Sequence, residues 1–212
     1  MPPQSVSGQG MRGLAAYRIM RSWFLVATAA LLVVVAAASL LVYAGIYNIA
    51  ADTPHTQPVF WLMQLVRERS IAVRAAGVLV PPDLADPKRI VAGAGQYAEM
   101  CSSCHLAPSM KRTEMSRGLY PRAPELRRGS NLTPAEEFWV VKHGVKMTGM
   151  PAWGVTHNNE LIWDVVAFLR KLPELTPDEY QALVRNAPKT HDEMTQEMEM
   201  GTGQGNGDQL RR

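Results

Sequence analysis

The longest hydrophobic stretch of the chain lies close to its N-terminus. No charged residue occurs at positions 22–51, and the segment Trp23–Tyr47 is almost wholly apolar, with aromatic residues at both ends. About 20 apolar helical residues cross a bilayer core, so this segment is long enough to span one with some tilt. Trp and Tyr at the two ends suit the membrane interfaces. The pattern predicts a transmembrane anchor over residues 22–49.

The charges on either side of this stretch set its expected orientation. Residues 1–21 contain three arginines and no acidic residue, which places them in the cytoplasm and everything after the anchor outside it. A cleaved signal peptide would have a shorter apolar core, followed at once by a small-residue cleavage site. The small residues 36–38 are followed by Leu40 and Leu41, so cleavage there would leave an apolar N-terminus. We therefore expect the anchor to be retained.

Residues 58–77 are expected to form an amphipathic helix. Five of its apolar residues are expected on one face: Val59, Leu62, Met63, Val66 and Val73. A helix with one apolar face packs either on a folded domain or on a membrane surface. Both placements stay open, and His55, just before the helix, is interpreted as an ordinary loop residue.

The second half of the chain carries helix start and stop signals. The sequence Thr-Pro-Xaa-Glu occurs at residues 133–136 and 176–179, where the threonine caps a helix, proline fits its first position and glutamate caps in return. Gly144 is a natural stop for the first of these helices. Asn158 or Asn159 is expected to cap a further helix with periodic apolar residues.

A further helix is expected over residues 87–100, directly before the two cysteines. Gly93 and Gly95 within it are poor helix formers, which indicates close approach of another helix. Residues 106–131 are rich in proline and glycine and are expected to form loop and short turns. Because nothing in residues 86–186 alternates as a strand does, the fold class is expected to be all-α.

The only two cysteines of the chain, Cys101 and Cys104, are followed directly by His105. A structural zinc site needs four ligands, and no second cysteine pair exists to complete one. A redox dithiol of the thioredoxin type would lie in a strand–helix–strand setting, which the surrounding sequence does not indicate. In a haem attachment site the two thiols add to the vinyl groups, and the turn brings His105 to the iron as proximal ligand. The motif predicts one covalently bound haem c.

A sixth ligand of the haem iron is expected in residues 146–153. A methionine thioether is a soft, neutral ligand that raises the reduction potential. Pro151 favours an extended backbone at Met150, and Gly149 allows the loop to turn. We therefore expect Met150 to be the distal ligand, with Met147 as the second choice.

His143 and His157 are rival distal ligands, but neither has a second feature that supports the role.

The formal net charge of +3 is small, and the basic residues are not gathered into one arm or helix, so nucleic acid is not an expected partner. Lys142, His143 and Lys146 would either steer an acidic redox partner or form a solvated helix end. No second haem motif, nucleotide-binding glycine loop or nucleophile constellation is found, which favours an electron carrier over an independent enzyme.

Together these features resemble class I c-type cytochromes with one haem, and in particular the haem domains of cbb-type oxidase subunits. The resemblance covers residues 86–185. Its residues follow one another in the family order: Gly93, Tyr97, Cys101-Ser102-Ser103-Cys104-His105, Pro121, Pro124, Thr148-Gly149-Met150-Pro151-Ala152-Trp153, Trp163 and Phe168.

This resemblance implies an all-α, class I cytochrome c-like haem domain, here preceded by one transmembrane helix. It implies that the helix carrying Gly93 and Tyr97 crosses the helix carrying Trp163. It also implies that a carbonyl group in residues 121–124 accepts the Nδ1 proton of His105.

The expected organisation has five segments. They are a cytoplasmic N-terminus (residues 1–21), a transmembrane anchor (22–49), a linker with an amphipathic helix (50–85), a cytochrome c domain (86–186) and a disordered tail that contains methionines (187–212).

The expected function is electron transfer by a periplasmic cytochrome anchored in the bacterial cytoplasmic (inner) membrane. His105 and Met150 would be the axial ligands of its single haem, and its partners would be redox proteins at the membrane. Two alternatives stay open: a haem-bearing subunit of a larger respiratory oxidase or dehydrogenase complex, and a haem protein that binds a gas or peroxide.

Overall fold

The structure, a computed structural model, describes residues 8–188, so residues 1–7 and most of the expected tail lie outside it. The chain divides into two compact units, Met1–Thr53 and Pro54–Arg212. Within residues 8–188 every regular element is helical and no strand occurs. The all-α expectation is therefore confirmed for this part of the chain.

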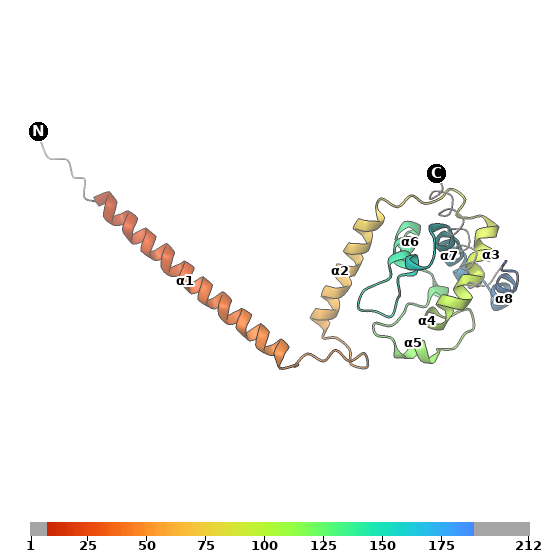
Figure 1. The fold of residues 1–212 in the computed structure, drawn as a ribbon, viewed down its shortest axis with the longest axis horizontal. Helices are drawn as coiled ribbons and strands as arrows, with labels where there is room; N and C mark the ends of the chain where they lie inside the picture. The colour runs from red at the N-terminus through yellow and green to blue at the C-terminus, as the bar shows by residue number, and fades with distance from the viewer. Residues whose placement is uncertain (1–7, 189–212) are drawn as a thin grey trace, which may run out of the picture. The chain divides into compact units, whose positions relative to one another are not determined.

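The first unit contains one long helix, α1 (Gly8–Tyr43), drawn in red and orange in Figure 1. Its part Tyr17–Tyr43 is a candidate membrane span, with a mean hydropathy of 2.7 over its most apolar window and no buried residue in that window. A helix of that length rises about 40 Å, which exceeds the thickness of a bilayer core. The hydroxyl groups within it donate to carbonyl groups three or four residues earlier, as those of Thr28 and Ser39 do. Both hydroxyl groups are thus hydrogen-bonded, as polar groups in an apolar surrounding need to be.

The second unit begins with α2 (Gln57–Ala75), which contacts α6 (Pro134–His143). The side chains that α2 buries are those of Ile71 and Ala75. Of the five apolar residues expected on one face, Leu62, Val66 and Val73 are exposed, and the other two are half-buried. The helix was predicted correctly, but its packed face is a different one, because apolar residues surround much of this helix and the period alone did not identify the side that packs.

The remaining helices enclose the core of the second unit. In chain order they are α3 (Pro87–Gln96), the π-helical turn η1 (Tyr97–Cys101), α4 (Ser102–His105), α5 (Glu114–Gly118), η2 (Leu126–Arg128), α6, η3 (Trp153–Val155), α7 (Asn159–Lys171), η4 (Leu172–Glu174) and α8 (Pro177–Arg185).

The predicted helix starts are present. In α6 the Thr133 hydroxyl accepts from the Glu136 N–H at 3.3 Å, and the Glu136 carboxylate accepts from the Thr133 N–H at 2.8 Å. The same reciprocal box, formed by Thr176 and Glu179, opens α8. Asn158, the first of the two candidates, caps α7.

The central contact of this unit is the crossing of α3 and α7, which confirms the crossing implied by the family resemblance. At Gly93 the two backbones approach so closely that an added Cβ would overlap the Asp164 carbonyl oxygen and lie 2.8 Å from the Phe168 Cβ. One turn further along the chain, where η1 begins, the rings of Tyr97 and Phe168 pack with centroids 5.2 Å apart. Only glycine permits this approach, because any other residue brings a Cβ into the backbone of α7.

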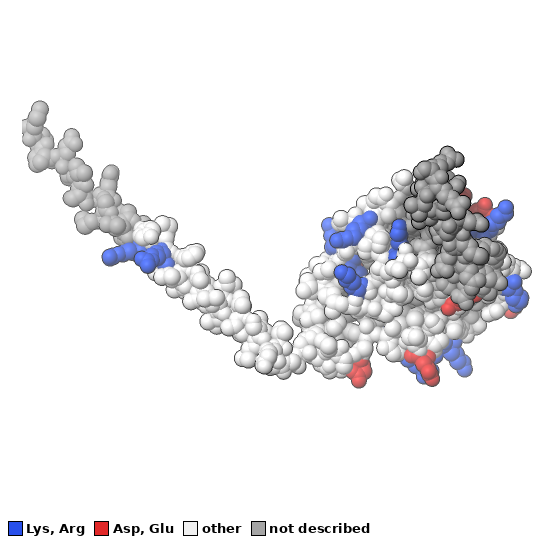
Figure 2. Space-filling model, in the orientation of Figure 1, with Lys and Arg blue, Asp and Glu red and all other residues white. Residues whose placement is uncertain are grey.

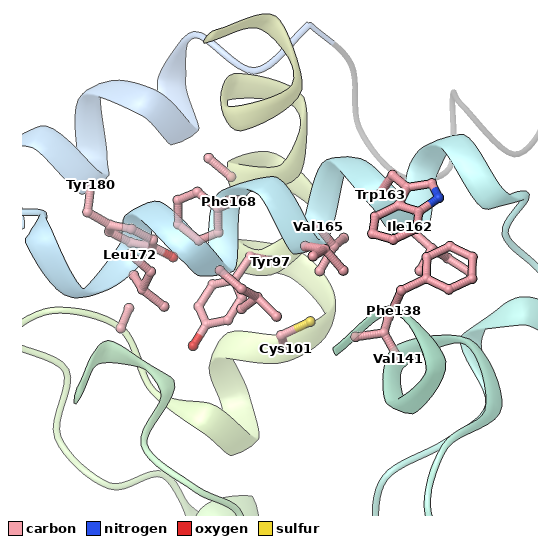
Figure 3. Close-up of a cluster of buried hydrophobic side chains, with 14 residues drawn as sticks. Tyr97, Cys101, Phe138, Val141, Ile162, Trp163, Val165, Phe168, Leu172 and Tyr180 are labelled. Atoms are coloured by element: carbon pink, nitrogen blue, oxygen red, sulfur yellow. The ribbon is translucent and has the colours of Figure 1, made fainter. Parts of the chain in front are cut away.

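A buried cluster extends from this crossing toward α6 and α8. Phe138 of α6 stacks on Trp163 of α7 with ring centroids 4.2 Å apart. Figure 3 shows Cys101 lying between the group around Tyr97 and Phe168 and the group around Phe138 and Trp163. The first cysteine of the motif is therefore part of the core rather than of the surface.

An ion cluster joins the beginnings of the two crossing helices. The Arg89 guanidinium of α3 donates to Asp164 and Glu160 of α7, both at 2.8 Å, and to Asp83 ahead of α3 at 3.0 Å. Because the Arg89 side chain is largely covered, these charge-assisted bonds are screened less than those of an exposed pair.

Gly93→Ala tests the dependence of the fold on the α3–α7 approach. We expect the free energy of unfolding to fall by about 3 kcal/mol, because the clash is with backbone that must shift. Urea unfolding of the holoprotein measures the change. Gly118→Ala is the matched control, since a Cβ there meets nothing within 4 Å, and it should stay within about 1 kcal/mol of the wild type. Equal unfolding midpoints for the two variants would contradict this account of the core.

Candidate haem-binding site

The Cys-Ser-Ser-Cys-His motif forms a compact turn at the end of α3. The α-helix widens into the π-turn η1 and then continues as α4, which places Cys101 in the core and Cys104 and His105 on the short helix. Both thiols are free of any disulfide. Burial raises the pKa of Cys101 to about 12, so this thiol stays protonated at neutral pH. A catalytic dithiol relies on a thiolate of lowered pKa, and Cys101 has the opposite character.

Hydrogen bonds between this turn and residues outside the motif hold it in place. The Tyr97 hydroxyl donates to the Leu106 carbonyl oxygen at 2.5 Å, where the backbone leaves α4 with a φ of 63°. The Ser102 hydroxyl donates to the Ala98 carbonyl at 2.6 Å, and the Thr113 hydroxyl donates to the Ser103 carbonyl. Burial raises the pKa of Tyr97, which keeps its hydroxyl a proton donor. Contacts within the protein thus hold the turn.

His105 is oriented by a single backbone bond. Its Nδ1 lies 2.9 Å from the Pro124 carbonyl oxygen, which confirms the bond implied by the family resemblance. A carbonyl oxygen can only accept, so Nδ1 carries the proton and Nε2 keeps its lone pair. Burial lowers the pKa of His105, with the Pro124 bond opposing. The imidazole is therefore neutral at neutral pH and presents Nε2, as a metal ligand must.

The segment that supplies the Pro124 carbonyl is itself tied to the start of this unit. The His55 N–H donates to the Tyr120 hydroxyl oxygen at 2.9 Å, and the two rings meet edge to face with centroids 5.1 Å apart. Sequence reasoning assigned His55 to an ordinary loop, because a contact between residues 65 positions apart leaves no local pattern.

The loop that carries Met150 is braced at three points. Gly144 has a φ of 64°, and an added Cβ there would lie 2.7 Å from the Met150 and Pro151 carbonyl oxygens. The Val145 N–H donates to the Met150 carbonyl oxygen at 3.2 Å. The Thr148 hydroxyl donates to the Val145 carbonyl at 2.7 Å and accepts from the Met150 N–H at 3.1 Å. Sequence reasoning placed Thr148 in the motif without giving it this role.

The two candidate methionines have different surroundings. Met150 is half-buried and packs on the same core cluster that contains Cys101. Met147 is 74% exposed and lies at a φ of 59°. The loop of Met150 also lies against Leu119, because a Cβ at Gly149 would overlap that side chain. The structure thus brings the Met150 loop next to the segment that leads to Pro124.

The two rival histidines are engaged elsewhere. His143 is exposed, and its ring lies against Trp139 with centroids 4.9 Å apart. His157 is buried, with Nδ1 at 2.9 Å from the Thr156 hydroxyl and 3.2 Å from the Trp153 carbonyl. Among residues 8–188 no three His, Cys, Asp or Glu side chains gather as they would around a metal ion.

The basic residues next to this loop are not equivalent. Lys142 is half-buried, donates to the Asn159 side chain at 2.8 Å and lies 5.6 Å from the centroid of the Phe138 ring. Its role is thus at least partly structural. His143 and Lys146 are exposed, and they are the members of the cluster open to a partner.

The donor atoms of this region fit a covalently attached haem. Cys101 and Cys104 offer two free thiols. His105 offers a neutral imidazole with an available Nε2, and Met150 offers a half-buried thioether. The soft sulfur and the imidazole nitrogen are the axial donors that suit a low-spin haem iron. No carboxylate belongs to this set, so it does not suit a hard cation.

Residues 88–169 match the family model described as cytochrome C oxidase, cbb3-type, subunit III. The matched segment runs from α3 nearly to the end of α7 and includes all four candidate haem-binding residues. No curated protein and no solved structure matched the chain.

Tyr97→Phe tests the brace on the attachment turn. The variant keeps the ring that packs on Phe168 but leaves the Leu106 carbonyl without its donor, so we expect the free energy of unfolding to fall by about 1–2 kcal/mol. Urea unfolding of the holoprotein measures it. Tyr97→Leu, which also removes the ring contact, should lose clearly more. A wild-type midpoint for Tyr97→Phe would show that the bond does not support the turn.

Proposed function

We propose that this chain, whose residues 88–169 match the cbb3-type subunit III family model, transfers single electrons through one haem c outside the cytoplasmic membrane. The observation that carries the proposal is the His105 Nδ1–Pro124 bond of 2.9 Å beside the two free cysteines. This bond keeps the proton of His105 on Nδ1 and so leaves Nε2 available to ligate haem iron, on the residue that directly follows the second cysteine.

Each residue of the site has a defined part in this function. Cys101 and Cys104 would hold the haem through thioethers, and because they are the only cysteines of the chain, one haem is proposed. His105 would ligate the iron through Nε2, and Met150 through its sulfur. The haem, when bound, supplies the Fe(II)/Fe(III) couple. The protein would orient the two axial ligands through the bond from Nδ1 of His105 to Pro124 and the bonds that Thr148 makes in the Met150 loop.

The candidate span in α1 supports a membrane anchor. We propose that it crosses the bacterial cytoplasmic membrane once, with the arginine-rich N-terminus inside and the cytochrome domain in the periplasm. A carrier held in this way would exchange electrons with redox proteins at the same membrane. Reduced and oxidised spectra of the detergent-purified chain, with a redox titration, test the electron-transfer role.

A second candidate function is that of a fixed haem subunit in a larger respiratory complex. The description of the matching family, an oxidase subunit, favours it. Purification from membranes in mild detergent separates the two: a free carrier elutes alone, and a subunit elutes with other redox proteins. A gas- or peroxide-binding role is less well supported, because the braces on the Met150 loop favour an occupied sixth position.

Met150→Ala tests the distal ligand. The oxidised protein should lose the weak sulfur-to-iron charge-transfer band, and its reduction potential should fall because the thioether no longer stabilises the reduced iron. Absorption spectra and a redox titration measure both effects. Met147→Ala is the matched control and should keep the band, since that side chain is 74% exposed. A band that persists in Met150→Ala would rule Met150 out.

Thr148→Val tests whether the loop holds Met150 in place. The change keeps the branched shape but removes a bond donated to Val145 and one accepted from Met150. At about 1 kcal/mol for each bond, the open sixth position should become more populated and CO should bind the reduced protein about tenfold faster or more. Stopped-flow mixing with CO measures this rate. Thr148→Ser retains the hydroxyl and should behave as the wild type, and equal rates for Val and Ser would contradict the role.

A further inference from the structure

The outward face of α2 is an apolar surface that the second unit leaves uncovered. With 100° between successive residues, positions 61, 62, 65, 66, 72 and 73 fall on one arc of the helix, opposite the side that contacts α6. Among the larger side chains on this arc, Trp61 is 63%, Leu62 51% and Val73 65% exposed. We call this arc, with the residues at these six positions and Arg69, the outer face of α2.

Charge on α2 has one predominant sign. The helix contains three arginines, Arg67, Arg69 and Arg74, and one acidic residue, Glu68. Arg69 lies within the outer face, and no acidic residue does. Figure 2 shows basic side chains gathered over the C-terminal half of α2, where these arginines occur. An apolar face with an arginine among its tryptophan, leucine and valine side chains matches the composition of helices that lie in the interface of an anionic membrane.

The chain itself limits what this face can meet. Residues 44–56 connect the end of α1 at Tyr43 with the start of α2 at Gln57, a reach of at most about 45 Å when fully extended. If α1 spans a bilayer, the start of α2 therefore stays within about 45 Å of that bilayer. An exposed apolar surface of this kind would otherwise favour aggregation.

We propose that the outer face of α2 binds the surface of an anionic lipid bilayer, with its apolar side chains at the boundary between headgroups and acyl chains. The Arg69 guanidinium would pair with lipid phosphate while its aliphatic stem lies among the apolar side chains. This inference rests on the proposed function only in that α1 anchors the chain in that bilayer.

Binding of this face would orient the cytochrome domain. α2 contacts α6, whose end leads into the Met150 loop. His55, two residues before α2, donates to Tyr120 in the segment leading to Pro124. A bilayer that fixes the roll of α2 therefore fixes the direction in which the haem site faces along the membrane, and hence which partners can reach it.

The full-length holoprotein, reconstituted in vesicles of phosphatidylethanolamine and phosphatidylglycerol, allows a direct test. A nitroxide label is placed at Leu65→Cys on the outer face, and at Val155→Cys, which is 84% exposed and lies outside α2, as the matched control. We expect collisions with a water-soluble nickel chelate to be roughly tenfold rarer at the Leu65 label, because the chelate does not enter the acyl region. Equal collision rates at the two labels would overturn the proposal.

Two further measurements complete the test. Arg69→Gln should reduce the protection at the Leu65 label in vesicles with phosphatidylglycerol, and Arg69→Lys should retain it, since the attraction is electrostatic. Dipolar coupling between Leu65 labels of two chains would identify a second copy as the occupant and overturn the proposal.

Controls separate this inference from the proposed function. The wild-type holoprotein should take up no label, because both thiols are held by haem, so uptake there would contradict haem attachment. Resistance of the chain to extraction with alkaline carbonate reports the span of α1. A chain that resists extraction but exposes the Leu65 label to the chelate refutes the role of α2 alone, and a chain that is released refutes the anchor.

Discussion

The close approach of α3 and α7 at Gly93 is the contact on which the second unit depends. Because no side chain separates the two backbones there, Tyr97 can pack on Phe168 one turn later. The Tyr97 hydroxyl then reaches the Leu106 carbonyl and holds the turn that contains the cysteines and His105. A single missing Cβ thus determines where the attachment turn lies relative to the core.

Two loops complete the candidate site, and hydrogen bonds within the protein hold each of them. Pro124 offers its carbonyl oxygen to His105 and so selects the nitrogen left for iron. Gly144 allows the close approach of the Met150 loop, and the Thr148 hydroxyl holds the loop by bonds to the Val145 carbonyl and the Met150 N–H. These bonds fix the backbone around His105 and Met150, as the proposed electron-transfer function requires.

The role proposed for α2 rests on the large apolar side chains that this helix leaves exposed. The helix buries Ile71 and Ala75 on its inner side, yet it leaves Trp61, Leu62 and Val73 in contact with solvent. If the candidate span in α1 crosses a bilayer, the 13 residues that connect it to α2 keep that bilayer within reach of these side chains. In the proposed arrangement, the anchor, the linker and α2 would together orient the cytochrome domain at the membrane.

The sequence by itself determined the local features. Three helix starts were predicted from their capping residues, because a cap acts within one turn. The residues are Thr133 with Glu136, Thr176 with Glu179, and Asn158. The order of cysteines, histidine and methionine indicated haem, since the chemistry resides in residue type and spacing. The tertiary structure decided which face of α2 packs, the bond of His55 to Tyr120 and the difference in burial between Met147 and Met150. These depend on contacts between residues distant in the chain, and such contacts leave no periodic pattern in the sequence.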